Sequence, residues 1–176
     1  LQWAIIEGLS HFFKNFSIIT APTVGSYPFG YKKMYLSGAV FKNDFLMQSK
    51  NLSVSYINFP FLNLISKYFS IKKEINSWLE KNKGNETQII VYSVHTPFLK
   101  PVIEAKKKYE NLSVTLIVPD LPRYMSDNTN IFHKYLKRID NYILNSCIKK
   151  VDSFVLLSKH MKNPLQVLDR EWVLVE

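Results

Sequence analysis

Residues 88–118 read QIIVYSVHTPFLKPVIEAKKKYENLSVTLIV, and this stretch decides the fold class. Two short apolar runs, at 88–94 and 113–118, enclose a segment at 99–109 whose apolar residues recur at helical spacing. The runs lack a strict polar–apolar alternation, which is typical of strands buried on both faces of a parallel sheet. A right-handed helical crossover joins such strands. The stretch therefore predicts a strand–helix–strand unit.

The same alternation of helices and strands continues on both sides of this unit. The other expected helices lie at 3–13, 61–79, 132–148 and, in a short piece, 160–167. The other expected strands lie at 16–21, 34–41, 52–59, 153–157 and 172–175. Strands that are separated by amphipathic helices favour one architecture. We expect an α/β fold with a Rossmann-like, open, mainly parallel sheet that carries helices on both faces.

Length and composition exclude several classes of protein. The 176 residues are enough for one domain, and a hydrophobic content of 47% can supply a core. The one cysteine, Cys147, can form neither an internal disulfide nor a zinc cluster, and we expect it to be a small buried side chain. No apolar stretch reaches the roughly 18 residues of a spanning helix, and no export signal precedes the first helix.

The chain is basic, with 23 Lys and Arg against 14 Asp and Glu and a net charge of +9. The densest lysine runs, at 72–73, 106–108 and 149–150, fall on or at the ends of expected helices. Such a surface attracts phosphate-rich partners, either anionic lipids or phosphorylated small molecules, and an ordinary solvated face is the plainer interpretation. We expect no nucleic-acid partner, because no zinc module, RNP1-like segment or basic zipper is present.

Several motifs of enzymes are missing. The sequence has no G-x-G-x-x-G, and residues 25–32 (GSYPFGYK) only approach a P-loop because Tyr31 stands where the phosphate-binding lysine belongs. It has no G-x-S-x-G nucleophile elbow, and its four histidines lack metal-ligand spacing. We therefore expect no metal site and no cofactor.

Polar residues follow three of the expected strands. Ser93, His95 and Thr96 come after the first of these strands, Asp120 after the second and Ser158 after the third. Ligands of open α/β sheets bind where the carboxyl ends of the strands meet. These residues therefore predict a site on one rim of the sheet.

Each of these residues also has a plainer interpretation. His95 could donate a hydrogen bond to a substrate oxygen or bind a neighbouring backbone carbonyl. Asp120 could accept hydrogen bonds from sugar hydroxyls, orient His95 or cap its own loop. Ser158 could cap a helix or mark a helix end that faces an anionic group.

Taken in order, the segments resemble a known family. They are Val94-His95-Thr96-Pro97-Phe98-Leu99, Val118-Pro119-Asp120-Leu121-Pro122, residues 151–161 and Trp172-Val173-Leu174-Val175-Glu176. This series is similar to the amino-terminal half of family 4 (group 1) glycosyltransferases, above all bacterial members that build capsular polysaccharides or exopolysaccharides. The resemblance covers nearly the whole chain and depends on the order and spacing of segments.

The resemblance implies a GT-B enzyme, in which two Rossmann-like lobes face each other. Such enzymes retain the sugar's configuration, need no metal and work on the cytoplasmic side, often as peripheral proteins at the inner membrane face. The nucleotide sugar is bound mainly by the carboxyl-terminal lobe, and a saccharide or lipid-linked acceptor by the amino-terminal one. Residues 1–176 would form the acceptor-side domain, with its first strand and the second lobe outside this sequence. We expect this domain to be inert alone.

The resemblance also implies roles for rim residues. His95 matches the histidine beside the reacting sugar and would be the catalytic residue. Ser93, Thr96, Asp120 and Ser158 would bind substrate. The alternative is a non-catalytic Rossmann-like module that binds phosphate-bearing partners through its basic face.

An aromatic loop at residues 27–33 gives the basic charge a further meaning. Its members that could face an anionic membrane are Tyr27, Phe29, Tyr31, Lys32 and Lys33. Aromatic rings and lysines together suit the boundary between lipid headgroups and water. A plain exposed loop is the alternative.

Overall fold

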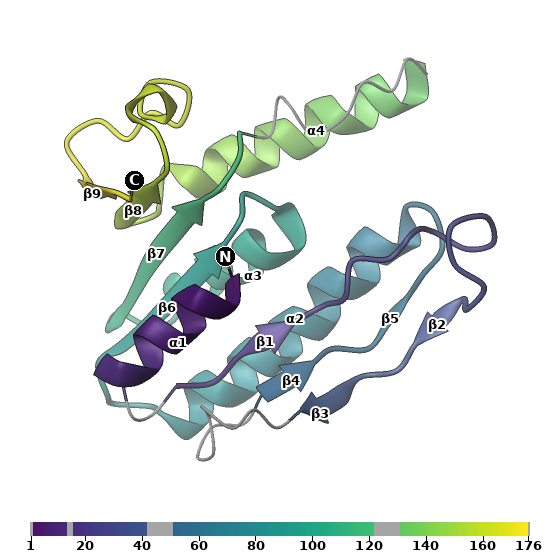
Figure 1. Cartoon of the computed structure of the whole chain (residues 1–176), viewed down its shortest axis with the longest axis horizontal. Coiled ribbons are helices and arrows are strands. Elements are labelled where there is room, and N and C mark those ends of the chain that lie inside the picture. Colours follow the sequence, from purple (N-terminus) through teal and green to yellow (C-terminus); the bar gives the residue numbers. More distant parts are fainter. Residues whose placement is uncertain (1, 14–15, 42–50, 122–130, 176) are drawn as a thin grey trace. The chain divides into compact units, whose positions relative to one another are not determined.

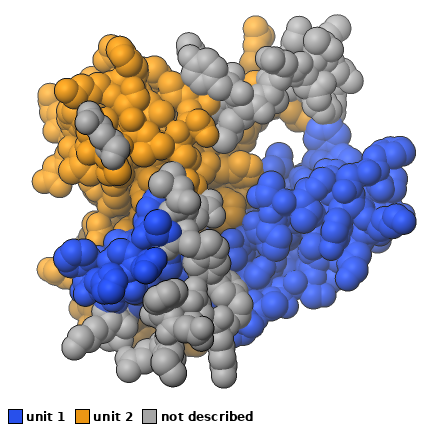
Figure 2. Space-filling model, viewed as in Figure 1, with its two compact units in different colours: residues 1–74 blue, residues 75–176 orange. Residues whose placement is uncertain are grey.

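The computed structural model describes residues 2–13, 16–41, 51–121 and 131–175. It divides into two compact units, unit 1 (Leu1–Glu74) and unit 2 (Ile75–Glu176) (Figure 2). Helix α2 (Leu62–Lys81) contributes residues to both. The rim residues and the aromatic loop therefore belong to different units, the rim residues to unit 2 and the loop to unit 1.

Unit 2 is built around a sheet of four strands that are all parallel (Figure 1). The strands lie side by side in chain order, as β6 (Thr87–Tyr92), β7 (Leu112–Val118), β8 (Ser153–Leu156) and β9 (Glu171–Leu174). Helices α3 (Thr96–Lys106) and α4 (Ile131–Ile148) follow β6 and β7; they pack against each other, and α3 packs against β6 and β7. The expected Rossmann-like parallel sheet flanked by helices is confirmed.

The core of unit 2 lies on the face that α3 covers. Val91, Leu116 and Phe154 occupy directly adjacent positions on three strands, and all three are buried. The buried side chains of the two helices include Leu99, Val102 and Ile103 of α3 and Leu144, Cys147 and Ile148 of α4. Each fully buried aliphatic or aromatic side chain contributes about 1.5–3 kcal/mol. This layer therefore supplies much of the stability of the unit.

A polar row crosses the opposite face of the sheet. The Gln88 amide nitrogen donates to the Thr115 hydroxyl over 2.9 Å, and the hydroxyls of Thr115 and Ser153 are 2.8 Å apart. Side chains alternate between faces along a strand, so Thr115 points away from the face that carries Val114 and Leu116. The row links β6, β7 and β8 through side chains as well as through the backbone.

Unit 1 contains shorter and partly antiparallel strands. Strand β4 (Asn51–Ser53) pairs in parallel with β1 (Ile19–Thr20) and antiparallel with β3 (Ala39–Phe41). Strands β2 (Tyr35–Leu36) and β5 (Tyr56–Ile57) form a separate antiparallel pair. The unit also holds helix α1 (Gln2–Phe12) and the first turns of α2. The sheet is thus all parallel in unit 2 but mixed in unit 1.

The strands expected at 34–41 and 52–59 are each broken into two. The first break contains Gly38, where a Cβ atom would lie 2.8 Å from the Ser53 carbonyl oxygen. The backbone therefore passes too close to its neighbour for any side chain. Periodicity cannot show such a close approach, because it depends on chain segments that lie far apart in sequence.

The short helix expected at 160–167 is wrong in length. The structure has one turn of 3-10 helix, Lys159–Met161, followed by turns. Pro164 lacks a backbone N–H, and Gln166 has a φ of 50° in the left-handed region. Neither feature is compatible with a continuing α-helix.

Lys67 is unusual within α2, because only 8% of it is exposed. Its ammonium lies 4.3 Å from the ring centroid of Tyr56, whose hydroxyl donates to the Pro22 carbonyl oxygen over 2.5 Å. Burial lowers the pKa of the Lys67 ammonium. Burial also raises the pKa of the Tyr56 phenol, and the nearby Tyr31 adds to that rise.

Candidate functional site

The rim of the parallel sheet begins at the carboxyl end of β6. The Ser93 N–H donates to the Ile117 carbonyl oxygen over 2.9 Å, which extends the ladder between β6 and β7 by one residue. Ser93 has a φ of 78°, a left-handed conformation that costs a residue with a side chain about 1–2 kcal/mol. Its carbonyl oxygen then accepts from the His95 N–H over 3.1 Å. This sharp turn ends the strand and places His95 at the start of α3.

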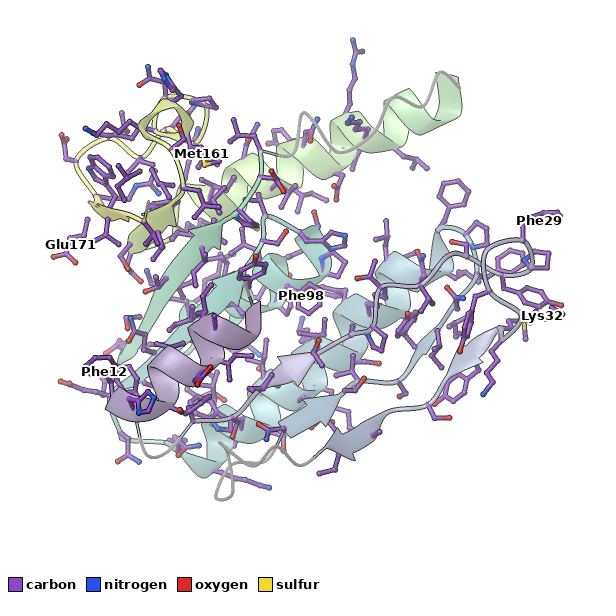
Figure 3. All side chains as sticks on the ribbon, viewed as in Figure 1. Phe12, Phe29, Lys32, Phe98, Met161 and Glu171 are labelled. Atoms are coloured by element: carbon purple, nitrogen blue, oxygen red, sulfur yellow. The ribbon has the colours of Figure 1, made fainter. Side chains whose placement is uncertain are left out.

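His95 is the N-cap residue of α3. Its backbone carbonyl oxygen accepts from the N–H groups of Phe98 and Leu99, and its side chain makes no capping hydrogen bond. The half-buried imidazole lies edge-on to the Phe98 ring, with 6.0 Å between the ring centroids. Phe98 is labelled in Figure 3. The imidazole therefore packs against Phe98 at the carboxyl edge of the sheet. It is neither fully buried nor fully exposed.

Thr96 is joined to a residue that the sequence interpretation missed. Its hydroxyl donates to the Asp140 carboxylate of α4 over 2.5 Å. The bond ties the first turn of α3 to α4, and it leaves the Thr96 oxygen able to act only as an acceptor. Asp140 follows Arg138 and Ile139 in a polar stretch of α4, so by sequence it resembles an ordinary solvated residue. Only the packing of the two helices reveals its partner.

The other rim residues are placed less tightly. Asp120 follows β7 and is exposed. The Ser158 hydroxyl accepts from the His160 N–H over 3.3 Å, so Ser158 is the N-cap of the short 3-10 helix. The plainer interpretation of Ser158 is thus confirmed, and its hydroxyl hydrogen stays available to a ligand. Strand order brings Ser93, Asp120 and Ser158 to the same edge of the sheet.

The buried Asn58 holds the aromatic loop of unit 1 through hydrogen bonds. The side-chain amide nitrogen of Asn58 donates to the carbonyl oxygens of Gly25 and Lys33, at 2.9 and 3.3 Å, and the backbone carbonyl oxygen of Asn58 accepts from the Tyr27 N–H over 3.0 Å. Asn58 has no exposed surface. Two hydrogen bonds from one amide therefore fix both ends of the loop. Sequence reasoning missed Asn58, because the partners of a lone asparagine in a strand-like segment cannot be read from the pattern.

The loop presents its rings outward. Phe29 is fully exposed, and Tyr31, Lys32 and Lys33 are exposed as well, whereas Tyr27 is half-buried (Figure 3). A Cβ atom on Gly25 would lie 2.7 Å from the Gly30 Cα atom. The two glycines that imitate a P-loop are thus explained by the contact of two backbone segments.

A hollow of about 330 Å³ lies away from the rim. It is lined by Ile103, Lys106, Lys107 and Lys150, near the carboxyl ends of α3 and α4. The Lys106 ammonium donates to the Asp152 carboxylate over 2.5 Å and to the Lys150 carbonyl oxygen over 3.0 Å. Among the described residues, the ammonium groups of Lys107 and Lys150 form no ion pair with a carboxylate.

Within residues 2–13, 16–41, 51–121 and 131–175, no three His, Cys, Asp or Glu side chains gather closely enough to hold a metal ion. In the same part of the chain, no helix has both the length and the apolar character needed to cross a bilayer.

Comparison with models of protein families, with curated proteins and with solved structures found no match to this chain.

Proposed function

We propose that residues 1–176 form the acceptor-side domain of a retaining GT-B glycosyltransferase of cell-surface polysaccharide synthesis. In this proposal a sugar passes from a nucleotide-sugar donor to a saccharide or lipid-linked acceptor. The proposal rests on the resemblance of the segments described above and on one structural observation. This observation is a half-buried imidazole, held by Phe98, at the carboxyl edge of a parallel sheet.

The rim offers the chemistry that sugar recognition needs. Because the Nδ1 atom of His95 is buried, a sugar hydroxyl beside the developing positive charge of the transfer would bond to Nε2, which can donate or accept one hydrogen bond. The Thr96 hydroxyl donates its hydrogen bond to the Asp140 carboxylate, so its oxygen can only accept a hydrogen bond from a sugar hydroxyl. The exposed carboxylate of Asp120 would accept from sugar hydroxyls, and Ser93 and Ser158 would add hydroxyls at the same edge.

The proposal also includes a cellular location. The protein would work on the cytoplasmic side and sit as a peripheral protein at the inner membrane face. The exposed Phe29, Tyr31, Lys32 and Lys33 support this location, because rings and lysines on one loop suit an anionic lipid surface. Most donor contacts would come from a second lobe outside this sequence.

The test is a transfer assay with the full-length protein, a panel of radiolabelled nucleotide sugars and a polyprenyl-linked acceptor. We expect His95→Ala to lower the rate about a hundredfold, the usual effect of removing one aligned hydrogen-bond donor. His11→Ala is the matched control, because His11 is exposed on α1 and outside the rim. Equal unfolding temperatures would show that both variants fold. Normal rates for His95→Ala would remove His95 from its role, and no transfer from any nucleotide sugar would overturn the proposal.

A second candidate function is a non-catalytic module for phosphate-bearing partners. The hollow lined by Lys106, Lys107 and Lys150 favours it, because the Lys107 and Lys150 ammonium groups would attract phosphate there, whereas Lys106 is paired with Asp152. Titration with inorganic pyrophosphate would test this candidate. The module would be favoured over the enzyme if the Lys107→Gln/Lys150→Gln double variant bound pyrophosphate more weakly and the original protein transferred no sugar.

A further inference from the structure

The exposed side of α2 in unit 1 is apolar. Leu62, Ile65 and Phe69 are spaced three and four residues apart, so they form one stripe along the helix. Their exposed fractions are 46%, 53% and 60%. The opposite, buried side carries the charged Lys67 together with Ile71. An ordinary surface helix has charged or polar side chains on its solvent side, so an apolar solvent side is unusual.

The stripe is extended by the residues that lead into the helix. Phe59 and Phe61 are exposed, and Phe61 has a φ of 65°, a left-handed conformation that is strained for a bulky side chain. The Asn63 N–H donates to the Phe59 carbonyl oxygen over 2.9 Å, which holds this approach against the first turn of α2. We call Phe59, Phe61, Leu62, Ile65 and Phe69 together the α2 surface.

Hydrogen bonds join the α2 surface to the strand pair beside it. The Ile57 N–H donates to the Ser66 hydroxyl over 3.0 Å, and the same hydroxyl donates to the Leu62 carbonyl oxygen over 2.7 Å. Tyr35 and Ile57 are direct cross-strand partners, and both are exposed. The apolar area therefore continues from helix to strand. Contiguous exposed area of this kind marks a contact with a membrane or a partner.

The charges beside the α2 surface favour a membrane with anionic lipids. Lys73 is exposed one residue after the half-buried Lys72, close to the carboxyl end of the stripe. Lysines outnumber Asp and Glu in residues 1–74. Large apolar side chains with an exposed lysine ammonium group at one end of the stripe match the layer where acyl chains meet phosphate headgroups. A protein partner with an apolar face would not need this positive charge.

We propose that the α2 surface enters the interfacial layer of an anionic bilayer, with Phe69, Ile65 and Leu62 reaching the acyl chains and Lys73 meeting lipid phosphates. This inference rests on the membrane location proposed above. It makes the α2 surface the main contact with the membrane and the aromatic loop a second one. It does not depend on the transfer reaction, so the two proposals can fail separately.

The test is flotation of the whole chain with vesicles of phosphatidylcholine alone or mixed with phosphatidylglycerol. The variant carries Ile65→Gln and Phe69→Gln, since glutamine keeps helix propensity but removes the apolar side chain. The exposed halves of these two side chains predict binding to the mixed vesicles that is about thirtyfold weaker. We expect Lys73→Gln to weaken binding to the mixed vesicles about fivefold and to leave binding to pure phosphatidylcholine unchanged.

A matched control carries Tyr142→Gln and Leu168→Gln, which replace two strongly exposed apolar residues of unit 2. We expect this control to bind like the original chain. Circular dichroism would show that all variants keep their helices. Equal binding by the Ile65/Phe69 variant and the original chain would overturn the inference, even if Phe29→Ala abolished binding. A dimer that dissociates in the Ile65/Phe69 variant, with no vesicle binding by the original chain, would also overturn it.

Discussion

Arg170 allows a quantitative test of how unit 2 is held together. Its guanidinium donates to the carbonyl oxygens of Ile148 at 2.5 Å, Val167 at 3.0 Å and, more weakly, Val151 at 3.4 Å. It also lies 4.7 Å from the ring centroid of Phe154. One side chain thus joins the end of α4, the start of β8 and the turn before β9.

The cost of removing this group can be worked out from those contacts. Two good hydrogen bonds to carbonyl oxygens contribute about 1 kcal/mol each, and a cation over a ring adds about 0.5–1 kcal/mol. The carbonyl of Ile148 would also lose the partner that satisfies the helix end. We therefore expect Arg170→Met to lower the free energy of unfolding by about 3 kcal/mol. Arg170→Lys keeps the charge but loses the fork of donors, so about half of that loss should remain.

Urea unfolding followed by circular dichroism would measure these free energies. Lys162→Met is the matched control, because the Lys162 ammonium also lies over a ring, 4.4 Å from the centroid of Trp172. Its loss should cost less than about 1 kcal/mol. A change below about 0.5 kcal/mol in Arg170→Met would refute the reasoning, and so would an Arg170→Lys variant as stable as the original chain.

Three other predictions follow from buried polar groups. Asn58→Leu removes the donors to the Gly25 and Lys33 carbonyl oxygens, so urea unfolding should show a loss of about 2–3 kcal/mol and trypsin should cut after Lys33 faster; unchanged cleavage would contradict this. Burial lowers the pKa of Lys67, so the folded chain binds fewer protons there than the unfolded chain as pH rises from the lowered value to 10.5. The stability of Lys67→Met relative to the original chain should therefore fall over this pH range in urea titrations, and a constant difference would refute the effect. Burial raises the pKa of the Cys147 thiol, so Ellman's reagent should label it at least about a hundredfold more slowly in the folded chain than in urea, and equal rates would show an accessible thiolate.

The sequence predicts the strands and the longer helices of unit 2 well, because their periodicity reflects burial against nearby elements. Strand β7 begins one residue before its expected start and ends where Pro119 removes a donor. Helix α2 ends where Gly84, with a φ of 90°, and Asn82 stop it, as the pattern indicated. Local signals were sufficient for these bounds.

Unit 1 and the polar partners were harder to predict, since they depend on contacts between distant residues. Nothing near Gly38 in the sequence shows that the Ser53 carbonyl crowds it, and nothing near Asp140 identifies Thr96 as its partner. The rule for parallel sheets placed Ser93, Asp120 and Ser158 at one edge of the sheet, yet the capping bond of Ser158 could only be offered as one of two interpretations. Single-residue roles need coordinates, whereas layers of a fold do not.

The hydroxyl of Thr115 has a consequence for how the sheet finds its alignment during folding. Strand β7 is apolar at most positions, so Val, Leu and Ile alone would tolerate a shift of one residue against β6 and β8. A shift of one residue would move the Thr115 hydroxyl to the apolar face of the sheet that α3 covers. It would also separate the hydroxyl from Gln88 and Ser153. A hydroxyl stranded in apolar surroundings costs about 1–3 kcal/mol. The Thr115 hydroxyl thus makes the native register of β7 lower in free energy than a register shifted by one residue.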